Sequence, residues 1–242
     1  MVNGSNSVSL FESSPSVVLA IYAHPDDADV ACGGSLARWV DEGARVRVLL
    51  LTDGAKGTTD ASVTPSVLAT TRKQEVAKAA KELGGVEVES LGLSDGDVGE
   101  QREILGTLVR RIRELKPDVV LGHDPTAVFF GSVYVNHQDH RAAGWAVLDA
   151  VGPASSMPHY FPECGLAHRV HDVLLSGTLE PDTYVDITSS IDRKVKAVTA
   201  HHSQLPDDPH WAGETIRQQA SDDGSRVGVA FAEGFRHLRL NG

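Results

Sequence analysis

The sequence predicts a Rossmann-like α/β fold: a doubly wound, mostly parallel sheet with helices on both faces, in a single domain. Strand-length apolar runs alternate with helix-length amphipathic stretches from residue 17 to residue 151. Chains with this alternation build parallel sheets, and their right-handed crossovers place helices on both faces. A length of 242 residues allows one large α/β domain or at most two small ones, and no linker clearly divides the chain.

The expected strands are continuous β-branched or aliphatic runs, which is typical of strands buried on both faces. They lie at residues 17–22, 45–52, 86–91, 119–122, 170–176 and 184–187. The expected helices lie at residues 28–40, 67–83, 102–116, 140–151 and 191–202. Gly43 suits a left-handed end of the first helix, and Pro117 ends the third.

The chain is expected to form one domain over residues 16–242, preceded by a flexible N-terminal leader over residues 1–15. The leader has neither the basic stretch nor the long apolar run of an export signal. Residues 152–168 are loop-like, and the alternating pattern changes after them. We therefore expect the C-terminal third to cap the sheet and to help form the wall of the site.

Composition excludes several classes of protein. The 33 acidic residues outnumber the 22 basic ones, and no basic stripe is present that could neutralise nucleic-acid phosphates. No apolar run approaches the ~18–20 residues that a membrane span requires. Two cysteines cannot form a disulfide framework, so we expect a cytoplasmic protein.

Two clusters of histidine and aspartate fall where a parallel sheet binds ligands, beyond the carboxyl ends of its strands. They are AHPDDAD at residues 23–29 and NHQDH at residues 136–140. His24, Asp27 and His140 are expected to bind a metal ion. Two histidines and a carboxylate with room for water match an open catalytic zinc site, and iron(II) accepts the same ligands.

The remaining residues of these clusters are expected to be catalytic. Asp26 suits a general base for the attacking water. His137 is expected to act as a protonated acid, with Asp139 orienting its ring and holding it cationic. Helix capping is the alternative role for Asp26 and Asp27. The sequence argues against dinucleotide binding, because no G-x-G-x-x-G motif follows the first strand and paired acids repel phosphate.

These two clusters resemble the PIG-L/LmbE-like family of zinc-dependent de-N-acetylases. The resemblance extends over nearly the whole chain, through LTDGAKG at 51–57, LGLSDGD at 91–97, PDVVLGHDP at 117–125 and AHHSQ at 200–204. It implies a Rossmann-like fold and removal of acetyl groups from N-acetylglucosamine-type conjugates. It also implies His24, Asp27 and His140 as metal ligands, Asp26 as base, and His137 as acid or oxyanion stabiliser.

Two positions depart from the family pattern. Ala28 stands where the usual HPDDE has glutamate, and Gln138 stands where the usual HPDH has proline. Neither change removes a proposed ligand, so the expected metal site is complete.

Three residues outside the two clusters are expected to bind substrate: Arg72, Asp95 and His201. The alternative for Arg72 is a solvated helix face, and the alternative for Asp95 is a turn in a glycine-bearing loop. His201 lies at the end of a helix, where it could instead complement the helix dipole. His123 and Asp124, at a strand end, are expected to line the pocket.

The sequence therefore predicts a zinc-dependent hydrolase that acts on a linear amide, an N-deacetylase of a small amino-sugar conjugate. A related amidase acting on an amino-sugar thiol conjugate is one alternative. A non-haem iron enzyme is another, but its ligand set normally lies on a β-sandwich. A non-catalytic sugar-binding protein is the third, against which the Asp26 and His137 pair argues. The sequence leaves a homo-oligomer open and identifies neither the conjugate nor the native metal.

Overall fold

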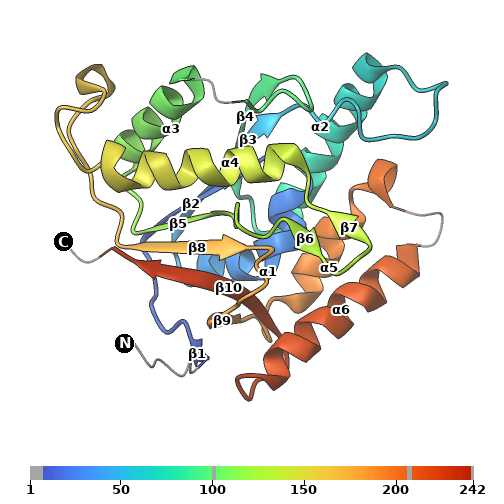
Figure 1. The fold of residues 1–242 in the computed structure, drawn as a ribbon. Coiled ribbons are helices and arrows are strands. Elements are labelled where there is room, and N and C mark those ends of the chain that lie inside the picture. The colour runs from blue at the N-terminus through green and yellow to red at the C-terminus, as the bar shows by residue number, and fades with distance from the viewer. Residues whose placement is uncertain (1–7, 100–101, 206–208, 241–242) are drawn as a thin grey trace.

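The computed structural model describes residues 8–99, 102–205 and 209–240. Its main strands are β1 (Ser9–Leu10), β2 (Val17–Tyr22), β3 (Arg45–Thr52), β4 (Glu87–Leu93), β5 (Val119–His123), β8 (Asp172–Ser176), β9 (Thr183–Asp186) and β10 (Ala232–Arg239). Within the described ranges they form one 8-stranded sheet in the order β1-β9-β10-β8-β5-β2-β3-β4 (Figure 1). Strand β10 runs antiparallel to both neighbours, whereas the other pairs are parallel.

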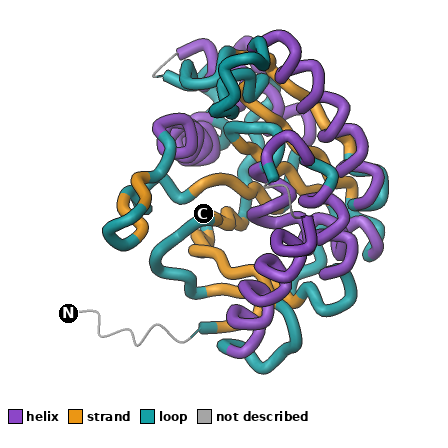
Figure 2. The backbone as a smooth tube through the Cα atoms, turned by 90° about the vertical axis from the view of Figure 1, so that its right-hand side faces the viewer, coloured by secondary structure: helices purple, strands orange, loops and turns teal. Residues whose placement is uncertain are grey.

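Helices pack on both faces of this sheet (Figure 2). They are α1 (Asp27–Asp41), α2 (Pro65–Glu82), α3 (Arg102–Leu115), α4 (Gln138–Asp149), α5 (Ile191–Thr199) and α6 (Pro209–Ser225). Short helical turns lie at η1 (Ala150–Ala154), η2 (Pro162–Cys164) and η3 (His202–Gln204). Successive residues of β2 enter different cores: Ala20 packs with α1, α2 and α5, and Ile21 packs with α3 and α4. The predicted doubly wound, mostly parallel sheet is confirmed.

The N-terminal boundary differs from the prediction. Residues 9 and 10 form β1, which pairs with β9, and Phe11 is buried against Trp39 and His237. The expectation of a flexible leader is therefore wrong for residues 9–11, because an aromatic side chain anchors them in the core. Residues 1–7 lie outside the described part of the chain.

The C-terminal third also differs, because it extends the sheet as well as covering it. Strands β8, β9 and β10 complete the sheet on the side of β5, and α6 packs against α5 and β10. A separate hairpin of β6 (Phe129–Phe130) and β7 (Tyr134–Val135) precedes α4. Among the residues described, no helix has the length and apolar character needed to cross a lipid bilayer.

Candidate metal centre

The candidate site lies at the carboxyl ends of β2 and β5, where the order of the strands reverses. From β2 the chain adds β3 and β4 on one side, and it then returns to add β5 on the other side of β2. Ligands of doubly wound sheets bind in the crevice at such a switch point. His24 follows β2, His123 ends β5, and His140 lies in the first turn of α4.

Three side-chain atoms converge on one point in this crevice. Nδ1 of His24 lies 3.1 Å from Nε2 of His140 and 3.3 Å from Oδ2 of Asp27. Nε2 of His140 lies 3.2 Å from the other carboxylate oxygen of Asp27. A tetrahedral zinc ion holds its ligand atoms at about 2.0–2.1 Å, which places them about 3.3 Å from one another. The three donors therefore fit a single divalent cation.

Negative charge surrounds the His24 ring. Burial lowers the pKa of this imidazole, but the hydrogen bond and charge of Asp27, with the charges of Asp95 and Asp139, raise it to about 9. Burial likewise raises the pKa of Asp27, but His123 and the two converging histidines lower it well below its usual value. Carboxylates that favour a positive imidazole also favour a bound divalent cation.

The loop between β2 and α1 brings His24 and Asp27 together. Oδ2 of Asp27 accepts a hydrogen bond of 2.7 Å from the backbone N–H of His24. Asp26 occupies the N-cap position of α1, but its side chain makes no capping hydrogen bond. Helix capping therefore does not explain why carboxylates stand at these two positions.

Helix α1 is broken shortly after this loop, at Cys32, whose φ of −143° and ψ of 16° are not helical. Beyond the break, the backbone N–H groups of Gly34 and Ser35 donate to the carboxylate of Glu233 at 2.9 and 2.8 Å. Nζ of Lys194 lies 2.5 Å from the same carboxylate. Glu233 of β10 thus holds the break that separates the first turn of α1 from the rest of the helix.

The ring of His140 is oriented by two neighbours. Its Nδ1 lies 3.0 Å from Oδ1 of Asn136, an amide oxygen that can only accept, so Nδ1 carries the proton and Nε2 is left free. The ring also stacks on His123, with centroids 4.1 Å apart and an interplanar angle of 10°. Asn136 therefore contributes to the candidate site. It belongs to the motif NHQDH, but the sequence alone assigns it no role.

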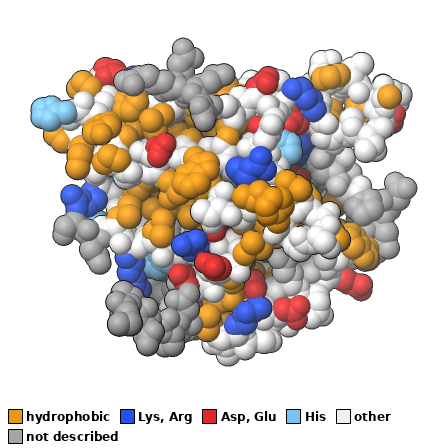
Figure 3. Space-filling view, in the orientation of Figure 1, with side chains coloured by type: hydrophobic (Ala, Val, Ile, Leu, Met, Phe, Trp, Pro, Cys, Tyr) orange, Lys and Arg blue, Asp and Glu red, His pale blue; other side chains and the backbone are white. Residues whose placement is uncertain are grey.

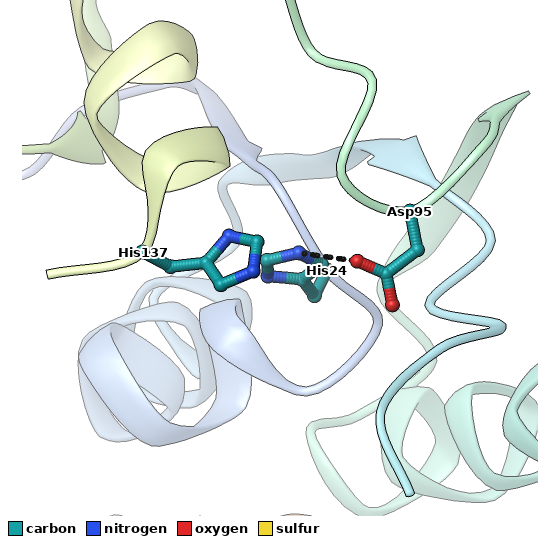
Figure 4. Close-up of side chains that lie close together, drawn as sticks. All are labelled: His24, Asp95 and His137. Atoms are coloured by element: carbon teal, nitrogen blue, oxygen red, sulfur yellow. Dashed lines mark ion pairs between the residues drawn. The ribbon is translucent and has the colours of Figure 1, made fainter.

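The far side of the His24 ring faces two buried aspartates. Nε2 lies 3.3 Å from Oδ1 of Asp95 and 3.4 Å from Oδ2 of Asp139. Figure 4 shows Asp95 and His137 on opposite sides of His24. Asp95 is 5% exposed, and its other oxygen accepts from the backbone N–H of Lys56. The carboxylate of Asp95 thus lies against the metal-binding histidine, and the prediction that Asp95 binds substrate stays a prediction.

Asp139 acts on His137 only in part as predicted. Its carboxylate lies 4.0 Å from Nδ1 of His137 and instead accepts hydrogen bonds from the backbone of Gly96 and Val98. Burial and the neighbouring charge of His24 lower the pKa of His137. The charge of Asp139 raises the pKa of His137, as expected, but burial and His24 outweigh it. Nδ1 of His137 accepts from the backbone N–H of Asp139, so the neutral ring carries its proton on Nε2.

Arg72 lies beneath the site and contacts Asp26. Its Nη2 lies 2.5 Å from Oδ1 of Asp26, and its Nη1 donates to the carbonyl oxygen of Gly54 at 3.1 Å. The arginine is 3% exposed. The alternative of a solvated helix face is therefore wrong for Arg72, whose guanidinium contacts Asp26, and its binding of substrate stays a prediction.

His201 is also buried away from the cavity, at 1% exposure. Its Nε2 lies 2.7 Å from Oδ2 of Asp29, a residue in the first turn of α1. The prediction that His201 binds substrate is wrong, because the imidazole is engaged inside the protein. It ties the loop after α5 to the turn that carries Asp26 and Asp27.

His123 and Asp124 have separate roles. Nε2 of His123 lies 3.2 Å from Oδ2 of Asp27, and the side chain lines the cavity. The carboxylate of Asp124 accepts from the backbone and hydroxyl of Thr126, so it builds a turn. The position of His123 at the end of a strand indicates that it lies near the site. Its contact with Asp27 depends on the tertiary structure and cannot be read from the sequence.

The two departures from the family pattern occupy different surroundings. Ala28 is buried in the core, where 2% of its surface is exposed. The side-chain amide of Gln138 donates to the carbonyl oxygen of Gly96 at 2.7 Å. Gln138 therefore adds a contact between α4 and the loop that carries Asp95.

A cavity of about 370 Å³ opens beside the converging ligands. Asp26, Asp27 and His140 are among the residues that line it. It runs between the β6–β7 hairpin on one side and α6 with β10 on the other. A ligand in this cavity would therefore contact both the metal-binding residues and the C-terminal third of the chain.

The chain is similar in sequence and fold to several proteins described as deacetylases of acetylated sugars. Residues 19–151 match the family described as PIG-L: GlcNAc-PI de-N-acetylase. Diacetylchitobiose deacetylase of Thermococcus kodakarensis is 35% identical over 226 residues, which cover 91% of this chain and 82% of the relative. A second relative, the 1D-myo-inositol 2-acetamido-2-deoxy-α-D-glucopyranoside deacetylase 2 of Saccharopolyspora erythraea, is 30% identical over 171 residues, 61% of this chain and 60% of the relative. The structure of N,N′-diacetylchitobiose deacetylase from Pyrococcus horikoshii superposes with a TM-score of 0.83 at 32% identity, covering 93% of this chain and 84% of that one.

Proposed function

The chain belongs to the PIG-L family of GlcNAc-PI de-N-acetylases, and we propose that it removes the acetyl group from an N-acetylglucosamine unit of a small conjugate. One observation carries the proposal. The donor atoms of His24, Asp27 and His140 lie 3.1–3.3 Å from one another, beside a further carboxylate on Asp26. The activities named for the two relatives, both of which act on acetylated glucosamine derivatives, support the same reaction.

His24, Asp27 and His140 would hold the cation, which we propose to be zinc. A bound cation would polarise the amide carbonyl and lower the pKa of water in the site. Asn136 keeps Nε2 of His140 free for this purpose, and the carboxylates of Asp95 and Asp139 lie 3.3 and 3.4 Å from Nε2 of His24. Loss of such contacts to metal-binding residues typically lowers metal affinity or activity 10- to 100-fold, so we include these residues in the proposed site.

Asp26 is the proposed general base. One of its oxygens is held by Arg72, which leaves the other oxygen to accept a proton from the attacking water. Asp26 lines the cavity next to Asp27, so its carboxylate faces the space where substrate would lie. After the attack the protonated Asp26 can return this proton to the departing amine nitrogen.

His137 is the proposed oxyanion stabiliser. Its Nδ1 already accepts a hydrogen bond from the backbone of Asp139, so Nε2–H is the group that can donate. A neutral donor aimed at the carbonyl oxygen strengthens its bond as negative charge develops there, which contributes about 3–4 kcal/mol to catalysis. This role needs no cationic ring, in keeping with the lowered pKa of His137.

Acetate release from N-acetylglucosamine and from N,N′-diacetylchitobiose tests the proposal. The protein is assayed after chelator treatment and after reloading with zinc, or with iron(II) under anaerobic conditions. We expect the chelated protein to be inactive and a divalent ion to restore acetate release. If both compounds bind to the metal-loaded protein and no acetate is released, the hydrolase proposal is wrong.

A further inference from the structure

We propose that the cavity beside the metal-binding residues is a subsite for a second, neutral ring of the substrate, with Phe130 and Tyr134 as its aromatic wall. The inference rests on the proposed deacetylase function, because the reacting acetamide must lie against Asp27 and His140. It goes further by naming the kind of group to which the reacting sugar is attached. It also assigns the choice of substrate to parts of the chain outside the two His/Asp clusters.

The hairpin presents two aromatic rings to the cavity. Phe130 pairs directly with Tyr134 across the hairpin, so the two side chains share one face. Their ring centroids are 5.7 Å apart, and both residues line the cavity. Phe129 pairs with Val135 and therefore lies on the opposite face. Aromatic faces carry negative potential that attracts the polarised C–H groups of a sugar ring.

Burial in the core does not account for these side chains. Tyr134 is 50% exposed, and hydrophobic side chains reach the surface where the hairpin lies (Figure 3). Val133, at its tip, is 90% exposed. Exposed apolar groups that border a cavity are typical of binding sites. A ring seated in the cavity would cover the exposed face of Tyr134.

The opposite wall supplies the polar groups that a hydroxylated ring requires. Ile216, Gln219 and Asp223 line the cavity from α6, and they recur at intervals of three and four residues, which places them on one face of the helix. The amide and carboxylate can bond hydroxyl groups at the edge of a ring, while Ile216 contacts its apolar face. A wall of this mixed kind, opposite two aromatic rings, suits a pyranose or a polyol ring.

The described lining of the cavity offers no free basic side chain to an anionic group. Among the described residues that line it, the one lysine or arginine is Lys194, whose ammonium group is 2.5 Å from Glu233. Phosphate recognition uses free Arg or Lys side chains, or the N-terminus of a helix. In the proposed site Asp27 binds the cation and Asp26 contacts Arg72, which leaves Asp223 as a further carboxylate of the lining. A phosphate-bearing aglycone would therefore meet the carboxylate of Asp223 and no free basic side chain of the described lining, and a volume of about 370 Å³ is small for a lipid anchor.

Rates on matched substrates test the aromatic wall. We measure kcat/KM of the metal-loaded protein for N,N′-diacetylchitobiose and for N-acetylglucosamine, and expect at least a tenfold preference for the disaccharide. Phe130→Ala and Tyr134→Ala should each lower kcat/KM on the disaccharide about tenfold, at least five times more than on the monosaccharide. Phe129→Ala is the matched control, since it removes a 65% exposed ring from the other face and should change neither value. Equal losses on both substrates, or no loss, would overturn the subsite.

A third substrate tests the charge of the cavity. N-acetylglucosamine 1-phosphate should be a poorer substrate than the neutral methyl glycoside of N-acetylglucosamine. Asp223→Asn should narrow this difference several-fold, because it removes a carboxylate and keeps the shape of the side chain. If the 1-phosphate is a better substrate than the methyl glycoside, the proposal that the subsite binds a neutral group is wrong.

Calorimetric titration with N,N′-diacetylchitobiose separates this inference from the proposed function. If no compound is deacetylated, but Phe130→Ala and Tyr134→Ala weaken binding at least fivefold, the hydrolase proposal is wrong and the subsite stands. If acetate is released and both variants bind as tightly as the wild type, the subsite is wrong and the proposed function stands. Unchanged circular dichroism and thermal midpoints of the variants would confirm that they are folded.

Discussion

The guanidinium of Arg72 and the carboxylate of Asp26 meet at 2.5 Å, although 46 residues separate them in the sequence. Arg72 belongs to α2 and Asp26 to the loop before α1, so the pair joins two segments on the same side of the sheet. Arg72 is buried, whereas the Asp26 side chain keeps 24% of its surface exposed. The contact therefore fixes one oxygen of a carboxylate that remains accessible from the cavity.

Asp26→Asn should retain the metal and lose at least 100-fold in kcat. An amide cannot accept a proton at neutral pH, and general base catalysis contributes roughly 10²–10⁴-fold. Acetate release measures the rate, and elemental analysis measures the metal. Near-full activity with the metal bound would show that another group is the base.

Arg72→Lys should lower kcat about tenfold while the metal content stays unchanged. Lysine keeps the charge, but it cannot contact Asp26 and the Gly54 carbonyl at once through a planar fork. Lys73→Met is the matched control, because this neighbour on α2 is exposed. If both variants retain the wild-type rate, Arg72 does not position the base.

Asn136→Ala should weaken metal binding 10- to 100-fold, because it removes the acceptor that orients Nδ1 of His140. Competition with a chromophoric chelator measures the affinity. Asn136→Asp restores an acceptor and should recover most of the loss. If Asn136→Ala binds the metal as tightly as the wild type does, the contact between Asn136 and His140 does not support metal binding.

His137→Ala should lower kcat by roughly 10²–10³-fold with little change in metal content, since one oxyanion donor is removed. His137→Gln keeps an N–H donor and should retain more activity than the alanine variant. Single-turnover acetate release separates this chemical step from product release. Loss of the metal in His137→Ala would indicate a ligand role instead.

The fold was predictable where local patterns are strong. Residues 17–22 form a continuous apolar run because both faces of β2 are buried, and the helices packed on it are amphipathic enough to recognise. Helix α6 was missed because its apolar residues are few and scattered among polar ones: Trp211, Ala212, Ile216 and Ala220. Strand β10 was missed because it inserts between β8 and β9, a pairing that no local pattern encodes.

The candidate site was likewise predictable only in part from the sequence. His24, Asp27 and His140 could be predicted because metal-binding residue types stand at the ends of two strands that share an edge. The partners of Asp95, Asp139 and His201 could not be predicted, since they depend on contacts between distant segments. His201 contacts Asp29 across 172 positions, for example, and no spacing in the sequence indicates this pair.

Glu233→Gln should destabilise the protein by about 3–5 kcal/mol, because it leaves the buried ammonium of Lys194 without its counter-charge. It should also weaken the acceptor for the N–H groups of Gly34 and Ser35 at the break in α1. Urea unfolding of the metal-free protein measures the change without a contribution from metal binding. Asp192→Asn breaks the exposed pair with Arg217 and should cost less than about 1 kcal/mol. If the two variants lose equal stability, the buried pair between Lys194 and Glu233 does not contribute more to stability than an exposed one.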